Sequence, residues 1–255
     1  MINLCNYLVE HQKCRLEAVG KPSDYARNHG SRFLEDIGFY QKTMNVRFKG
    51  DAACPPTCRP RFRLESEGYH AWFYSEVTPW MSSIFSVKDD EPSTWHELYT
   101  VLGEIFANIK DHAGSGAQIA SVFMQHYPEA KNLHIAISDF GVGIPYNVRR
   151  VKPKIGDDSE AILHGVIDGF TSRSTPKNMG AGLDTLIKNI VNSLGGSVMI
   201  VSYFGEARFW IDKTTSTMKV STPKSPITQV YPGTLIYLTI PTIPRPDMED
   251  EDLSW

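Results

Sequence analysis

The spacing of apolar residues changes along the second part of the chain, and each change predicts a different element. Between residues 98 and 109, apolar residues recur at intervals of three and four, which is the repeat of an amphipathic helix. They are Leu98, Val101, Leu102, Ile105, Phe106 and Ile109. Residues 133–139 alternate apolar with smaller or polar side chains, and 133–139, 197–202 and 234–240 are all predicted to be strands. A second helix is predicted over 183–194, ended by the two glycines at 195 and 196.

The first ninety residues show weaker patterns. Phe33, Leu34, Ile37 and Tyr40 have helical spacing, so a helix is predicted within 22–44. Three prolines interrupt residues 47–63, which are predicted to be a loop. The aromatic-rich stretch 69–80 is expected to be core, since large rings are usually buried. A polar, proline-containing segment at 88–93 is a credible boundary.

These elements predict an α+β protein in which helices cover one face of a sheet, a two-layer sandwich. The predicted order from residue 94 is helix, strand, long loop, helix, strand, irregular stretch, strand. We divide the chain into a mainly helical extension of unassigned role (1–92), one domain (93–246) and an acidic tail (247–255).

Composition restricts the function classes. The chain has 255 residues, of which 41% are hydrophobic and 22% charged, as is ordinary for a globular protein. A formal net charge of −3 argues against nucleic-acid binding. No apolar run reaches the roughly 20 residues that span a bilayer, and the first residues do not resemble a secretion signal. We therefore expect a cytoplasmic protein that does not enter membranes.

Four cysteines occur near the beginning of the chain. Cys54 and Cys58 are spaced so that both thiolates can bind one metal ion, but a second pair of ligands at a familiar spacing is missing. The plainer interpretation is a set of reduced thiols, with the two prolines between Cys54 and Cys58 marking a turn.

Three short motifs carry candidate chemistry. The first motif lies in the helix predicted from residue 98. Its residues Glu104, Asn108 and Asp111 are spaced to lie on one face, away from the apolar positions. Taken alone, such a stripe is most often a solvated surface.

The second motif, Asp139-Phe-Gly141-Val-Gly143, follows a predicted strand. It places a carboxylate, which can accept a hydrogen bond from an exocyclic amine, beside glycines that leave space for a flat ring. A tight turn is the alternative.

The third motif, Gly180-Ala181-Gly182-Leu183, directly precedes a predicted helix. Glycines at a helix N-terminus expose backbone N–H groups that can hold phosphate. A flexible loop leading into the helix is the alternative.

Together and in this order, the three motifs resemble the N, G1 and G2 boxes of the GHKL superfamily, which includes gyrase, the histidine kinases and MutL. Residues 169–202, with Phe170 and a Leu-Gly-Gly-Ser-Val segment, and residues 232–241 also look like parts of a histidine-kinase catalytic domain. The resemblance covers 94–241. It implies a Bergerat-type two-layer α/β sandwich with a mixed sheet.

The resemblance also implies a ligand, Mg-ATP, and roles for individual residues. Asn108 would bind Mg²⁺, Glu104 would be the general base, Asp139 would accept the adenine amino group with support from Thr234, and Gly143 would let the base lie close. The loop 144–179 would be an ATP lid, whose basic residues could screen the triphosphate. The residues predicted to contact the nucleotide are Asn108, Asp111, His112, Asp139, Gly141, Gly143, Ile144, Arg173, Gly180, Ala181, Gly182, Leu183 and Thr234.

Several functions agree with this resemblance. The chain is predicted to hydrolyse ATP as an ATP-driven switch; the alternatives are a kinase that phosphorylates a partner protein, like the anti-sigma-factor kinases, and a non-catalytic ATP-sensing module. His112 could instead accept a phosphoryl group, but a ribose or phosphate contact or a packed ring is the favoured interpretation. A protein partner is expected, and a homodimer is common in the family.

Overall fold

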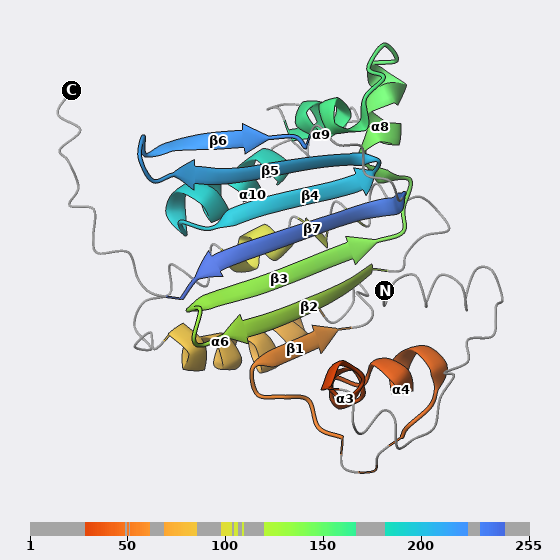
Figure 1. The fold of residues 1–255 in the computed structure, drawn as a ribbon, viewed down its shortest axis with the longest axis vertical. Helices are drawn as coiled ribbons and strands as arrows, with labels where there is room; N and C mark the ends of the chain where they lie inside the picture. The colour runs from red at the N-terminus through yellow and green to blue at the C-terminus, as the bar shows by residue number, and fades with distance from the viewer. Residues whose placement is uncertain are drawn as a thin grey trace.

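The computed structural model describes residues 29–48, 50, 52–61, 69–85, 98–103, 105, 106, 109, 120–166, 182–223 and 230–242. Seven strands form a single sheet in the order β1-β2-β3-β7-β4-β5-β6 (Figure 1). They are β1 (Cys58–Arg61), β2 (Ala120–Tyr127), β3 (Asn132–Asp139), β4 (Ser197–Tyr203), β5 (Gly205–Asp212), β6 (Thr217–Ser221) and β7 (Tyr231–Pro241). The predicted α+β class agrees with this architecture.

All pairings between these seven strands are antiparallel. The expected mixed sheet is therefore wrong for the described strands. Short connections join β2 to β3, β4 to β5 and β5 to β6, and a short connection can only link antiparallel neighbours. The predicted strands at 133–139, 197–202 and 234–240 correspond to β3, β4 and β7, whereas β2 was not predicted and the stretch expected to be irregular contains β5 and β6.

Helices cover one face of this sheet, and the two described helices that come first in the chain lie against the other face at the β1 edge. The described helical segments are α3 (His29–Asp36), α4 (Phe39–Met44), α5 (Tyr69–Trp72), η1 (Phe73–Val77), α6 (Thr78–Phe85), 98–103, α8 (Gly143–Val151), α9 (Asp158–Val166), α10 (Gly182–Lys188) and η2 (Asn189–Ser193). Both η segments are π-helical turns. None of the described helices combines the length and the apolar character needed to cross a membrane.

The main core lies between the sheet and this helical layer. Alternate residues of β3, namely Leu133, Ile135 and Ile137, are buried against it, as the period-two pattern predicts. Leu98 and Ile105 of the first predicted helix lie in the same cluster. Burial of each such side chain stabilises the fold by about 1.5–3 kcal/mol.

The aromatic stretch before residue 85 belongs to this same core. Trp72, Phe73, Val77 and Trp80 are buried in one cluster with the helix from Leu98 onward, which confirms the prediction that the stretch is core. β1 also belongs to the common sheet. Residues on the two sides of the predicted boundary near 92 therefore share one sheet and one core.

A smaller cluster lies on the opposite face, at the β1 edge. Phe123 of β2 and the fully buried Cys58 of β1 belong to a separate cluster with residues of α3 and α4. These two helices lie beside β1 in Figure 1. The predicted continuous helix is wrong at Gly38, whose φ of 78° separates α3 from α4. The predicted loop 47–63 contains β1. Pro60 is tolerated there because an edge strand does not need every N–H for the sheet.

Candidate functional site

Asp139 is the last residue of β3, and its side chain faces the helical layer. It is only 7% exposed. One carboxylate oxygen accepts a hydrogen bond from the Gly141 N–H at 2.6 Å, and the Thr234 N–H also hydrogen-bonds to the carboxylate. Burial raises the pKa of Asp139 to about 6, and these two N–H groups oppose the rise.

The carboxylate has capacity beyond these two donors. An ionised carboxylate offers about four lone-pair positions. Burial and two backbone N–H groups are the influences on the Asp139 pKa, and no cationic side chain of the described residues is among them. A buried carboxylate without a cation costs stability, and such groups are concentrated at functional sites. The geometry therefore suits a neutral N–H donor from a ligand.

Two glycines with positive φ lie next to Asp139. At Gly233, with φ of 89°, an added Cβ would lie 2.2 Å from the backbone oxygen of Asp139. At Gly143, with φ of 73°, it would lie 2.7 Å from the Tyr203 ring. The protein's own Tyr203 occupies the space that a side chain at 143 would take, and the expectation that Gly143 lets a ligand ring lie close stays a prediction.

Ser202 joins the two segments flanking Asp139, and the sequence patterns did not predict a role for it. Its hydroxyl accepts a hydrogen bond from the Ile144 N–H at 3.1 Å and donates to the Gly233 carbonyl at 2.6 Å. The pairing of β4 with β7 shifts register between Val201 and Tyr203, so Ser202 lies in a bulge, a feature common beside functional sites. The signal was available, because Ser202 continues the buried series Val198 and Ile200 with a polar side chain.

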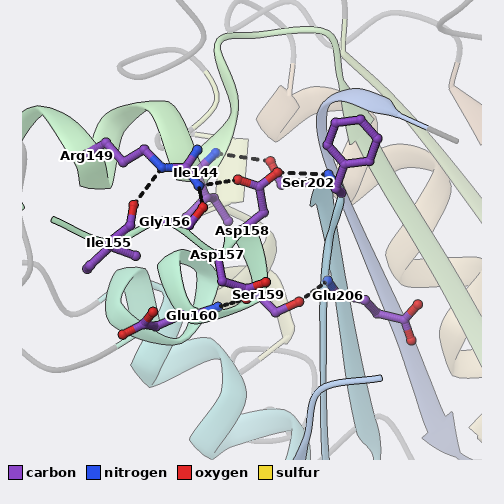
Figure 2. Close-up of polar contacts among 11 residues, drawn as sticks. Ile144, Arg149, Ile155, Gly156, Asp157, Asp158, Ser159, Glu160, Ser202 and Glu206 are labelled. Atoms are coloured by element: carbon purple, nitrogen blue, oxygen red, sulfur yellow. Dashed lines mark hydrogen bonds and ion pairs between the residues drawn. The ribbon is translucent and has the colours of Figure 1, made fainter. Parts of the chain in front are cut away.

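The segment expected to be a lid loop is folded where the structure describes it. Residues 143–166 contain α8 and α9, and Arg149 of α8 contacts the start of α9 (Figure 2). Its guanidinium donates to the carbonyls of Ile155 and Gly156, at 2.9 and 2.7 Å, and to the Asp158 carboxylate at 2.5 Å. Arg149 is therefore occupied by the protein and is not free to screen a triphosphate.

The same two helices are attached to the β4–β5 hairpin. The second Asp158 oxygen accepts from the Phe204 N–H at 3.0 Å, and the Ser159 hydroxyl accepts from the Glu206 N–H at 3.0 Å (Figure 2). A Cβ on Gly205 would lie 2.5 Å from the Asp158 backbone, so hairpin and helix are in direct contact. In the described part of the predicted lid, α9 is thus held against the β4–β5 hairpin by hydrogen bonds, and α8 follows the turn that contains Asp139.

We expect Arg149→Ala to lower the free energy of unfolding by about 2 kcal/mol, because three acceptors lose a charged donor that is partly screened by solvent. Urea unfolding of the variant measures this loss. Arg150→Ala is the matched control, since the neighbouring Arg150 is exposed and its loss should change little. Equal effects of the two substitutions would contradict the structural role of Arg149.

The structure brings five of the predicted site residues together. Asp139, Gly141, Gly143 and Ile144 form one turn leading into α8, and Thr234 pairs with Asp139 across β3 and β7. Gly182 begins α10, so the helix starts inside the third motif, one residue before the predicted start at 183. Seven predicted residues lie outside the described residues: Glu104, Asn108, Asp111, His112, Arg173, Gly180 and Ala181.

Cys54 and Cys58 are free thiols at the start of β1. The Cys54 thiol contacts the Cys58 carbonyl at 3.6 Å, and burial raises the pKa of both thiols. Within the ranges that the structure describes, no three His, Cys, Asp or Glu side chains are grouped as a metal site.

In comparisons with known proteins, the chain matches no family model and no curated protein. The described residues define an α+β protein with an open seven-stranded antiparallel sheet. Its candidate site is a buried carboxylate at the carboxyl end of β3, enclosed by α8, β4 and β7.

Proposed function

We propose that this protein binds Mg-ATP, with Asp139 accepting a hydrogen bond from the adenine amino group, and hydrolyses it as an ATP-driven switch. The observation that carries the proposal is the buried Asp139 carboxylate, held by two backbone N–H groups with no cationic partner among the described residues. Its pKa of about 6 leaves it mostly ionised at neutral pH, the form that accepts the stronger, charge-assisted hydrogen bond from an amine.

The order of the three motifs supplies the other half of the proposal. Asn108 would hold Mg²⁺, which neutralises phosphate charge when bound. Glu104 would orient and deprotonate water. The described residues of their helix, including Leu102 and Ile105, are buried in the core as the sequence predicts. The spacing predicts that positions 104, 108 and 111 lie on another face, and this prediction concerns residues outside the described part of the chain.

The proposal is tested by calorimetric titration with Mg-ATP together with a phosphate-release assay. We expect Glu104→Ala to bind Mg-ATP but to release phosphate about a hundredfold more slowly, because the general base is lost. Asn108→Ala should bind ATP more weakly and should no longer respond to Mg²⁺. Glu129→Ala is the matched control, since Glu129 is an exposed turn residue between β2 and β3.

The outcomes separate the candidate functions. Binding without phosphate release, but with label from γ-labelled ATP moving to a protein, would favour the kinase alternative. Binding without release or transfer, insensitive to Glu104→Ala, would favour a non-catalytic ATP-sensing module. Failure of the wild-type chain to bind Mg-ATP would refute the proposal.

A further inference from the structure

We infer that Ser202 is a positioning residue of the Asp139 site: its hydroxyl fixes the separation of the two backbone segments whose N–H groups hold the Asp139 carboxylate. The affinity part of its test rests on the proposed function, whereas the geometric part does not.

The two segments come from distant parts of the sequence. The first is the turn 139–144, which contributes the Gly141 N–H at 2.6 Å. The second is the beginning of β7, residues 231–234, which contributes the Thr234 N–H. The bond from Gly141 is local to the turn that holds Asp139, whereas the bond from Thr234 crosses from β7 and depends on how the two segments lie relative to each other.

Ser202 joins these same two segments from a third strand, β4. It accepts the Ile144 N–H of the first segment and donates to the Gly233 carbonyl of the second, with its side chain completely buried. Ile144 lies in the first turn of α8, where N–H groups have no partner within the helix, and the α8 N-cap residue provides no side-chain cap. Ser202 therefore caps α8 from outside the helix (Figure 2).

There is no room for the segments to approach more closely. A Cβ at Gly143 would be 2.8 Å from the Ser202 Oγ, and one at Gly233 would be 2.2 Å from the Asp139 backbone oxygen. Glycine at both positions allows the backbone segments to come into contact. The Ser202 hydroxyl lies between them and both accepts and donates a hydrogen bond there. A methyl group at position 202 would leave a buried N–H and a buried carbonyl without this partner.

Loss of the hydroxyl should therefore let the segments separate and weaken the hold on the Asp139 carboxylate. The pKa of Asp139 would then rise further, because fewer N–H groups favour the ionised form. Tyr231 is the titratable neighbour that senses Asp139; its hydroxyl is already bonded to Ser138 on the strand beside it. The Thr234 N–H, next to the Gly233 carbonyl that Ser202 holds, is thus the feature near Asp139 that Ser202 controls most directly.

The test compares Ser202→Ala, Ser202→Cys and Ser159→Ala with the wild type. Ser159 is the matched control, because its hydroxyl also accepts a buried backbone N–H but does so at α9, away from Asp139. In the ligand-free protein, carbon-13 NMR of labelled aspartate carboxyls measures the pKa of Asp139, with Asp139→Asn providing the assignment. Calorimetry with Mg-ATP at pH 7.5 measures affinity separately.

We expect the pKa of Asp139 to move from about 6 toward 7 in Ser202→Ala, to move less in Ser202→Cys and to stay unchanged in Ser159→Ala. Affinity for Mg-ATP should fall about tenfold in Ser202→Ala alone. An unchanged Asp139 pKa in folded Ser202→Ala and Ser202→Cys, or an equal rise in Ser159→Ala, overturns the inference. If the Asp139 pKa rises selectively in Ser202→Ala but the wild-type protein binds no Mg-ATP, the inference is supported and the proposed function is refuted.

Discussion

Asp139→Asn is expected to make the protein more stable at pH 7.5 while weakening its binding of Mg-ATP. The folded state raises the pKa of Asp139 from 3.8 to about 6, so it holds the proton more tightly than the unfolded chain does. Ionisation of Asp139 therefore destabilises the fold above pH 6, by about 3 kcal/mol for a shift of about two units. The penalty disappears as the pH falls through 6 toward 4.

An asparagine removes the charge but keeps the shape of the side chain. It offers one acceptor oxygen in place of two, which costs about 1 kcal/mol of the gain. We therefore expect a net increase of about 1–2 kcal/mol in the free energy of unfolding at pH 7.5, and a smaller difference at pH 5. Urea unfolding at both pH values measures this. Asp157→Asn is the control, since Asp157 is an exposed residue that caps α9 and asparagine caps equally well.

The same substitution should weaken Mg-ATP binding at least tenfold, because a charge-assisted hydrogen bond to the adenine amine becomes a neutral one. For the wild type, affinity should fall as the pH drops below 6 and Asp139 becomes protonated. If Asp139→Asn has a lower free energy of unfolding than the wild type at pH 7.5, the buried Asp139 charge does not destabilise the fold as predicted.

Gly233→Ala is expected to cost about 4 kcal/mol or to prevent folding. The backbone at 233 has a φ of 89°, which is unfavourable for alanine by about 1–2 kcal/mol. In addition, the new Cβ would lie 2.2 Å from the Asp139 oxygen and 2.7 Å from the Phe140 Cα, and neither backbone atom can rotate away. Only separation of β3 from β7 relieves the overlap.

Gly38→Ala is the matched control for this substitution. Gly38 has a similar φ of 78°, but an added Cβ would meet no atom within 4 Å. We expect a cost of about 1 kcal/mol there. The difference between the two variants in thermal or urea unfolding isolates the steric contribution at the β3–β7 contact. Equal losses would mean that β3 and β7 are not as close as the structure places them.

The sequence predicted the central strands well because their burial follows their alternation. Leu133, Ile135 and Ile137 face the helices, and the polar residues between them do not. The mixed sheet was expected from the GHKL resemblance, whereas the short connections β2–β3, β4–β5 and β5–β6 make these three pairs antiparallel. β1 was concealed by Pro60, and β6 has every side chain exposed, so it lacks an apolar face to detect.

The helices α8 and α9 were overlooked for a different reason. Residues 144–179 were expected to be a lid loop, although Pro145 is compatible with the first turn of a helix. Asp157 and Glu160 have the spacing of a helix-capping pair, and the Asp157 carboxylate does accept the Glu160 N–H at 2.8 Å. For the site, motif order identified Asp139 and Thr234, but periodicity could not reveal that Ser202 would meet Ile144 and Gly233, because that contact depends on a register shift.

β7 is the last strand of the described chain, yet it lies in the middle of the sheet. β1, β2 and β3 form one ribbon of sequence neighbours, and β4, β5 and β6 form another. The pairs β2–β3, β4–β5 and β5–β6 are local in sequence, but the pairing of β1 with β2 and of β3 with β7 requires closure of long loops and is slow for that reason. Until β7 enters, the inner edges of both ribbons are open to pairing with other chains. The candidate site around Asp139 is consequently completed last during synthesis, when β7, which bears Thr234, joins the two ribbons.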